Sequence, residues 1–385
     1  MKGRNAMMQD SSAQITERRR MTRNRMYRFI YDADHPVSKQ ELAARLGYSL
    51  PTVHQNIAEL MEGSYIKPGQ VLKSTGGRPA IGYCANSGLR FSVGISVSAN
   101  QVQYLVSDLM QNEVAYKKVV RTYSADEMPI ALHNDLEDFL DENEIDPKRV
   151  LGVGITFPGI IDKDKDVIEL SPTLRSRDVN LSAIREAIPY PLYFENDSTS
   201  AGNAEWLSLP LSERSDDFVY LFLENGVGGA IFVNGKPYQG AHRKSAEFGH
   251  MTVEPDGREC HCGRRGCLEA YCSALRFQKD LGMDVDTFFH ELEAGNEDCK
   301  ALWDDYLCHL AVAIHNLRMA FDCRVILGGF MCTYLEPHMD RLRGLVAGLS
   351  PFGESADFLQ IGRYPTKAVM MGSAWKFVDE FITKI

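Results

Sequence analysis

The sequence has no run of about 18 consecutive apolar residues, the length at which a helix could cross a bilayer, so it predicts no membrane span. Its first residues are polar and lack an apolar stretch, so no secretory signal is expected. Internal repeats and low-complexity segments are absent too, which argues against a repeat architecture. At 385 residues, 44% of them hydrophobic, the chain predicts a cytoplasmic globular protein of about two or three domains.

Acidic residues are scarce in the first 90 residues, which hold 14 lysines and arginines against 7 aspartates and glutamates. The remaining residues hold 28 against 45, so a basic head precedes an acidic body within a chain of net charge −10. This asymmetry indicates that only the head meets a polyanion such as nucleic acid. A chance fluctuation of surface charge is the alternative.

The clearest pattern in the basic head is a pair of short helices. Ser38 and Glu41 have the spacing of a capping box, and Gly47 suits the left-handed residue that ends a helix. A second helix is predicted from Ser49, with Pro51 in its first turn. Two short helices around a glycine turn are typical of a helix-turn-helix, whose second helix enters the major groove. The DNA contacts predicted on this second helix are Ser49, Thr52, His54, Gln55 and Asn56.

Two β-like runs follow around a loop that contains Lys73 and Arg78. They predict a wing, and hence a winged helix-turn-helix, in which the glycines at 76–77 let Arg78 approach the DNA backbone or minor groove. The alternative is a protein-contact domain made of a helical hairpin and a β-hairpin.

From residue 90 onward, strand-like runs alternate with helical ones. Three strands are predicted within 91–124, a helix around 128–142 and a buried strand within 150–162. Such units with glycine turns predict an α/β body with a cleft lined by loops at strand ends.

A compact group of metal-binding residue types lies within 250–267. His250, Cys260, Cys262 and Cys267 have the spacing H-x9-C-x-C-x4-C, which suits tetrahedral Zn²⁺ in a closed, structural site. Nine cysteines without a secretory signal also favour a metal over disulfides. His261 lies between two of these cysteines, and its side chain is expected to point away from the site. Reduced cysteines without a metal are the alternative.

The triplet at 195–197 follows a predicted strand and precedes a helix. Its carboxylate at Asp197 could accept a hydrogen bond from a sugar hydroxyl or act as a general base. The alternative is helix capping by Asp197 or Ser198.

Together these motifs resemble the ROK family (repressors, open reading frames, kinases) over nearly the whole chain. The supporting motifs are PGIID at 158–162, END at 195–197, ExGH at 247–250 and C-x-C-G-x2-G-C-x-E at 260–269. The resemblance implies an actin/hexokinase-like fold with a sugar site between two lobes. Its implied domains are a DNA-binding domain at 1–88, a first lobe at 89–198 with 370–385, and a second lobe with a dimerisation surface at 199–369. The sugar contacts that it implies are Asn196, Asp197, Glu247, His250 and Glu269.

Two departures from the kinase members concern the phosphate loops. The stretch matching their D-x-G-G-T loop contains Ser96 and lacks the glycines, and Glu224 stands in the second phosphate segment, where its charge would repel a triphosphate. Phosphoryl transfer depends on positioning the phosphate, so no kinase activity and no catalytic residue are predicted. Arg175, Arg177 and Asp178 either contact a sugar or its phosphate, or belong to a solvated loop.

The leading hypothesis is a sugar-responsive repressor that binds operator DNA as a homodimer or dimer of dimers. Its effector would be a sugar or sugar phosphate, and its cofactor a structural Zn²⁺. The alternatives are an active sugar kinase with a DNA-binding head, and a repressor controlled by a partner protein.

Overall fold

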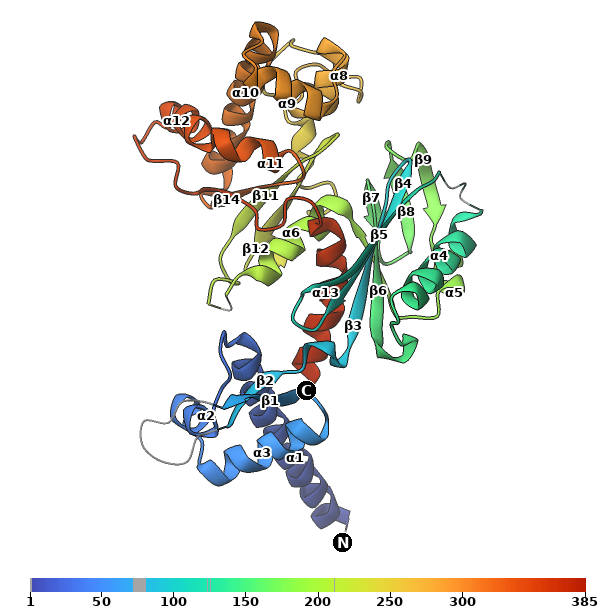
Figure 1. Cartoon of the computed structure of the whole chain (residues 1–385), viewed down its shortest axis with the longest axis vertical. Helices are drawn as coiled ribbons and strands as arrows, with labels where there is room; N and C mark the ends of the chain where they lie inside the picture. Colours follow the sequence, from blue (N-terminus) through green and yellow to red (C-terminus); the bar gives the residue numbers. More distant parts are fainter. Residues whose placement is uncertain (1, 72–80, 123, 125, 211) are drawn as a thin grey trace.

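The computed structural model describes residues 2–71, 81–122, 124, 126–210 and 212–385, in three parts (Figure 1). A small head at one end is joined to a body that contains two five-stranded sheets. We call the part built on the first sheet lobe 1 and the part built on the second sheet lobe 2. No helix in the described ranges combines the length and the apolar character that crossing a bilayer requires.

The head consists of helices and one β-hairpin. Its elements are α1 (Lys2–Asp32), α2 (Lys39–Leu46), α3 (Leu50–Glu62), β1 (Ile66–Val71) and β2 (Ile81–Ala85). The predicted caps are present, since Ser38 Oγ accepts from the Glu41 N–H at 3.1 Å and Ser49 Oγ accepts from the Thr52 N–H at 3.3 Å. Gly47 ends α2 in the left-handed conformation with φ 71°. The helix pair expected from these signals is therefore confirmed.

Lobe 1 is built on the sheet of order β10-β6-β3-β4-β5, in which β10, β6 and β3 run parallel and the others antiparallel. Its strands are β3 (Phe91–Val97), β4 (Gln101–Asp108), β5 (Glu113–Val120), β6 (Val150–Phe157) and β10 (Leu192–Asn196). The short 3₁₀ turns of this part are η1 (Ser87–Leu89) and η2 (Pro147–Arg149). A second, antiparallel sheet and two helices complete it, namely β7 (Ile160–Asp162), β8 (Val167–Ser171), β9 (Ser176–Asn180), α4 (Met128–Glu142) and α5 (Ser182–Ala187). The strands and the helix predicted for 91–162 are confirmed.

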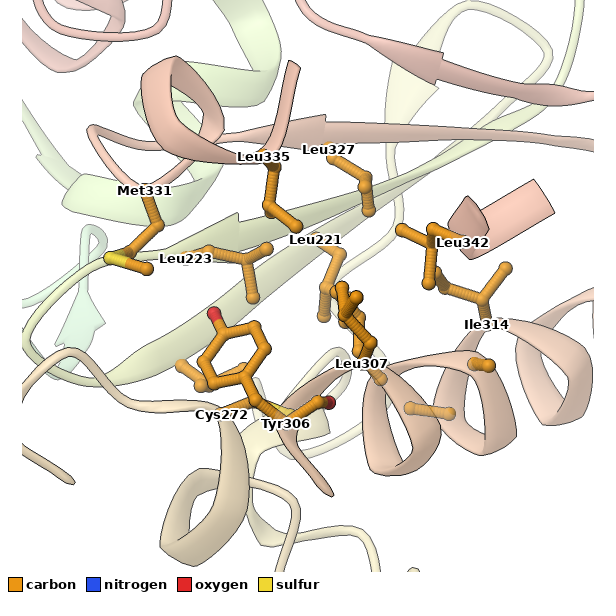
Figure 2. Packing of buried hydrophobic residues seen from close by; sticks show 14 of the residues in the cluster. Leu221, Leu223, Cys272, Tyr306, Leu307, Ile314, Leu327, Met331, Leu335 and Leu342 are labelled. Carbon is orange, nitrogen blue, oxygen red and sulfur yellow. The ribbon is translucent and has the colours of Figure 1, made fainter. Parts of the chain in front are cut away.

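Lobe 2 is built on the sheet of order β13-β12-β11-β14-β15. Its strands are β11 (Phe218–Leu223), β12 (Val227–Val233), β13 (Lys236–Pro237), β14 (Arg324–Gly328) and β15 (Leu359–Ile361). Its helices are α7 (Glu269–Cys272), α8 (Leu275–Leu281), α9 (Val285–Glu293), α10 (Glu297–Phe321), α11 (Cys332–Leu335) and α12 (Met339–Leu349), with 3₁₀ turns η3 (Phe248–His250) and η4 (Glu336–His338). Figure 2 shows the core between this sheet and α10, where Tyr306 and Leu307 face Leu221 and Leu223. This core anchors the loops that carry the site.

Two helices lie between the sheets, α6 (Asp197–Ser208) and α13 (Ala368–Lys384) (Figure 1). Small residues allow them to touch, because a Cβ atom at Gly372 would lie 1.7 Å from the Ser200 carbonyl oxygen. The Ser200 hydroxyl donates to the Val369 carbonyl at 2.7 Å. The first residue of α6 is Asp197, so this packing fixes the site relative to α13.

The head shares its core with the end of α13. Met26 and Ile30 of α1 belong to one buried cluster with Val378, Ile382 and Ile385. Polar contacts reinforce this packing: the Asn24 side-chain amide donates to the Ile382 carbonyl at 2.5 Å, and the Tyr31 hydroxyl donates to the Leu109 carbonyl at 2.7 Å. The head is therefore packed onto the body as well as joined to it by the chain.

Candidate functional site

The predicted metal ligands come together in a loop of lobe 2. The ligand atoms of His250, Cys260, Cys262 and Cys267 all lie within 4.8 Å of one another. The Cys262 and Cys267 sulfurs are 3.8 Å apart, and Cys260 Sγ is 3.8 Å from His250 Nδ1. Tetrahedral Zn²⁺ with Zn–S bonds of about 2.3 Å requires sulfur pairs roughly 3.8 Å apart. The geometry of this cluster therefore fits Zn²⁺.

The loop turns tightly enough to gather these ligands because glycine allows two left-handed residues. Gly263 has φ 84° and Gly266 has φ 77°. At Gly266 a Cβ atom would lie 1.8 Å from the Glu254 carbonyl oxygen, so no larger residue fits there.

His261 is a correction to the sequence-based expectation. Its side chain does not point away: Nδ1 lies 2.6 Å from Glu269 Oε1 and 3.8 Å from Cys260 Sγ. The other oxygen of Glu269 accepts a hydrogen bond from the Val227 N–H at 2.9 Å. This loop therefore fixes the orientation of a carboxylate that the family resemblance assigns to the sugar site.

Four carboxyl groups interact with one another beside this loop. Burial raises the pKa of Asp197 to about 6, opposed by hydrogen bonds from Ser198 and assisted by the negative charge of Glu247. Burial also raises the pKa of Glu224 to about 7, where the Phe330 N–H opposes and the Asp197 charge assists. The pKa of Glu247 is raised by burial, lowered by His250 and raised by Glu269. Acidic side chains thus gather beside the loop, and burial raises the pKa of Asp197, Glu224 and Glu247.

Asn196 caps α6, so neither Asp197 nor Ser198 is the cap that the sequence suggested. Its Oδ1 accepts from the Thr199 N–H at 3.0 Å, and its Nδ2 donates to the Gly159 carbonyl at 2.9 Å. Each end of the amide therefore makes one hydrogen bond within the protein. It does tie the PGIID segment to the start of α6.

Sequence reasoning missed the role of Glu195, which is only 2% exposed. Its Oε2 lies 2.5 Å from Lys163 Nζ and accepts a hydrogen bond from the Tyr193 hydroxyl. A buried carboxylate needs such partners. Glu195 therefore supports the strand that leads to Asp197.

On α3, four of the five predicted DNA contacts reach the surface, with Ser49, His54 and Gln55 exposed and Thr52 half-buried. Asn56 is the correction: it is 8% exposed, and its amide donates to the Thr52 carbonyl at 2.8 Å. Asn56 lies on the buried side of α3, which also carries Val53 and Leu60. Lys73 and Arg78, predicted on the wing, lie outside the described residues.

A lysine of α2 lies beside the exposed surface of α3, and sequence reasoning missed it. Lys39 Nζ lies 3.0 Å from His54 Nδ1 and brings a charge from α2 onto this face.

The arginines after the PGIID segment are exposed. Arg175, Arg177 and Asp178 lie on or next to β9, and no ion pair or hydrogen bond to the cleft carboxylates is recorded for them within the described ranges. This placement favours the solvated-loop alternative.

Comparison with known proteins identifies the family. The model of the ROK family matches residues 92–353. The chain belongs to the ROK family. This ROK protein is 27% identical to the xylose repressor of Caldicellulosiruptor bescii over 373 residues, which cover 90% of this chain and 93% of that one.

Other relatives match the chain over a shorter length. The xylose repressor of Bacillus subtilis is 29% identical over 248 residues, 64% of each chain. NagC of Escherichia coli, a DNA-binding transcriptional dual regulator, is 27% identical over 63% of this chain and 60% of its own length. The match thus spans less than two thirds of the length of these two relatives.

Solved structures agree on the fold. A ROK family transcriptional regulator, a homologue of the Escherichia coli Mlc protein, superposes with a TM-score of 0.73 at 20% identity and covers 95% of this chain and 97% of that one. A ROK glucokinase from Streptomyces griseus, solved with glucose and AMPPNP, gives a TM-score of 0.61 at 20% identity and covers 74% and 98%. The regulator matches the head as well as the body, whereas the kinase leaves about a quarter of this chain unmatched.

In this ROK protein the two segments that resemble phosphate loops have internal partners. Glu224 Oε1 accepts a hydrogen bond from the Phe330 N–H at 3.0 Å. This backbone donor, just after β14, is therefore already bonded to a carboxylate. The turn after Ser96 is closed by Ser98, whose hydroxyl donates to the Gln101 carbonyl at 3.1 Å. Both hydrogen bonds lie in the segments that resemble the phosphate-binding loops of the kinases.

Proposed function

We propose that this ROK protein is a cytoplasmic DNA-binding transcriptional regulator, a repressor of carbohydrate-utilisation genes, that responds to a sugar or sugar phosphate. The names of its relatives, xylose repressor and N-acetylglucosamine repressor, support regulation linked to sugars. The basic head supports operator DNA as the partner. A homodimer or dimer of dimers would place paired heads on a two-fold operator.

The proposed DNA contacts are on α3 and the wing. Ser49, Thr52, His54 and Gln55 keep their predicted role, and Lys39 joins them. Lys73 and Arg78 are proposed to reach the phosphate backbone or minor groove from the segment between β1 and β2. In this scheme α2–α3 and the hairpin form a winged helix-turn-helix within the proposed domain 1–88.

The proposed effector site is the acidic cleft. Asp197, Glu247 and Glu269 are proposed as acceptors for sugar hydroxyls. His250 is proposed to lie at the same site, because its charge interacts with Glu247. Asn196 is proposed to hold the cap of α6 in place of the sugar contact expected from the family. The proposed lobes, 89–198 with 370–385 and 199–369, would close around this ligand.

The proposed metal is a structural Zn²⁺ on His250, Cys260, Cys262 and Cys267. When bound, it supplies a fixed crosslink for the loop, and no chemical step. His261 and the loop backbone then hold Glu269 toward the cleft.

The observation that carries the proposal is the shared packing of α13. At one end α13 packs against α6, which begins at Asp197, and at the other it enters the core of the head. A ligand that shifts α6 would move α13 and with it the head. A regulator requires such coupling between two sites, whereas a kinase does not.

The test combines selection of DNA with titration of sugars. A DNA site is first selected from a random duplex pool, and fluorescence anisotropy then measures its affinity with and without D-xylose, N-acetyl-D-glucosamine and their phosphates. We expect one of these compounds to change the DNA affinity about tenfold, with a reciprocal change in its own affinity when DNA is bound. Sugar binding that leaves DNA affinity unchanged would contradict the proposal.

A coupled assay for ADP release separates the proposal from a sugar kinase. Glu224 beside the Phe330 N–H predicts no turnover with ATP and common hexoses. Turnover by the wild type that is lost in Asp197→Ala would contradict the proposal and indicate a sugar kinase.

A further inference from the structure

The segment 238–247 carries an arginine from lobe 2 to lobe 1. It follows β13 and ends at Glu247, which directly precedes the 3₁₀ turn that contains His250. Arg243 Nη1 lies 2.7 Å from Asp162 Oδ2, and its Nη2 lies 2.7 Å from Asp164 Oδ2. One guanidinium thus bridges two carboxylates of lobe 1, at the end of β7 and in the turn after it.

The receiving carboxylate at Asp162 is held in place by lobe 1 itself. It is 1% exposed, and its Oδ1 accepts from the N–H groups of Asp164 at 3.0 Å and Lys165 at 3.2 Å. Lys165 Nζ lies 3.1 Å from its other oxygen. Because the carboxylate cannot rotate freely, it fixes the direction from which Arg243 binds.

The backbone of the segment is held in an unfavourable conformation. Arg243 has φ 53° and Ala246 has φ 62°, in the left-handed region that residues with a side chain rarely occupy. Such conformations persist only where the surroundings hold them, and they gather at functional sites. Here the Ser245 hydroxyl donates to the Tyr238 carbonyl at 2.7 Å and closes the segment on itself. The segment is therefore held both by its own hydrogen bond and by the contact of Arg243 with lobe 1.

Both sides of the cleft connect to this contact. In lobe 1, the Asn196 amide holds the Gly159 carbonyl, three residues before Asp162, and so links the PGIID segment to Asp197. In lobe 2, Arg243 lies four residues before Glu247. The ion pair thus connects the segment that leads to Glu247 with the segment that is bonded to the start of α6 at Asp197.

We propose that Arg243 is a positioning residue for the cleft: its ion pairs with Asp162 and Asp164 hold the segment 238–247, and with it Glu247 and His250, at the spacing from Asp197 at which one polyhydroxyl ligand contacts both lobes. The inference rests on the proposed function, because it specifies how the effector site is assembled. Arg243 itself needs no contact with the ligand.

The experiment compares Arg243→Ala, Arg243→Lys and Asp164→Asn with the wild type. Asp164 is 86% exposed, so its variant removes the outer half of the contact with little risk to folding. The matched control is Arg185→Ala, which removes an arginine pair with Asp166, at 2.7 and 2.8 Å, that lies wholly within lobe 1. Hydrogen–deuterium exchange of the ligand-free chains reports on 160–171 and 238–250, and calorimetry with D-xylose and N-acetyl-D-glucosamine reports on binding.

In Arg243→Ala we expect both segments to exchange on the order of tenfold faster and the sugar Kd to rise by a similar factor, since hydrogen bonds between charged groups are among the stronger ones. Arg243→Lys and Asp164→Asn should show smaller changes in the same direction. Arg185→Ala should leave the exchange of 238–250 unchanged, because its partner Asp166 lies in lobe 1.

Unchanged exchange in Arg243→Ala would overturn the proposed contact. Faster exchange with an unchanged Kd, for a sugar that binds the wild type, would overturn the positioning role. If neither sugar binds the wild type, the proposed function loses its support for these effectors, while the exchange data still decide whether Arg243 holds the segment.

Discussion

At the scale of single residues, Asp197 links the proposed effector site to the stability of the fold. Its raised pKa, about 6, means that between about pH 4 and pH 6 the folded chain keeps a proton that the unfolded chain has released. The contribution of Asp197 to stability therefore falls as the pH rises through this window. Asp197→Asn removes this dependence, because an amide carries no charge.

We expect Asp197→Asn to gain roughly 1–2 kcal/mol in free energy of unfolding over the wild type between pH 4 and pH 7, after allowance for partial exposure. Urea unfolding at several pH values measures the difference. Asp138→Asn, at an exposed position of α4, should show no such trend. Parallel pH profiles for Asp197→Asn and the wild type would contradict the burial of this carboxylate.

The metal ligands give a second prediction at this scale. Cys267→Ser should lower the zinc content and reduce the Tm by on the order of 10 °C, because binding energy of a structural zinc is also folding energy. Elemental analysis and a thermal scan measure both. Cys308→Ser changes an exposed cysteine on α10 outside the cluster and should leave both values unchanged. A wild type purified without metal would refute the assignment of the ligands.

At the scale of elements, the contact between α6 and α13 depends on a glycine. A Cβ atom at Gly372 would lie 1.7 Å from a backbone oxygen of α6, so Gly372→Ala must push the two helices apart. We expect a loss of about 1–3 kcal/mol in free energy of unfolding by urea. Gly344→Ala is the matched control, since it lies within α12 with no atom within 4 Å and should gain about 0.5–1 kcal/mol. Equal effects of the two substitutions would mean that the helices can separate without cost.

The elements themselves were largely predictable, because their signals are local. Ser38, Gly47 and Ser49 act where the sequence suggested, since caps involve residues three or four positions apart. The gathering of His250, Cys260, Cys262 and Cys267 was predictable for the same reason, because they lie close together in the sequence.

Side-chain partners distant in sequence were not predictable from local signals. His261 was misjudged because its partner, Glu269, lies in the next helix. The contact of Asn196 with the Gly159 carbonyl was not foreseen, because it joins two separate segments of the chain. Asn56 was misjudged because helical spacing places it at the edge between the exposed and buried faces of α3, and only the packing of the head decides its side.

At the scale of the whole molecule, the junction of head and body predicts how the parts communicate. Ile382 is 5% exposed in the core of the head, although it belongs to a helix of the body. Ile382→Ala should loosen this junction by about 2–4 kcal/mol. We expect faster hydrogen exchange in α1 and α3 and a weaker effect of sugar on DNA affinity.

Ile314→Ala is the control for this prediction, since it removes the same volume from the core of lobe 2. It should reduce overall stability without a selective change in the head. Unchanged exchange of α1 and α3 in Ile382→Ala would show that the two parts are independent.

The same junction constrains how the protein is made. Asn24 and its partner Ile382 are 358 residues apart, so the inner wall of the head is synthesised long after the head itself. During translation the part of this core that α13 supplies is therefore missing until α13 is made. A chain that lacked Val378 and Ile382 of α13 would lack a fully packed head.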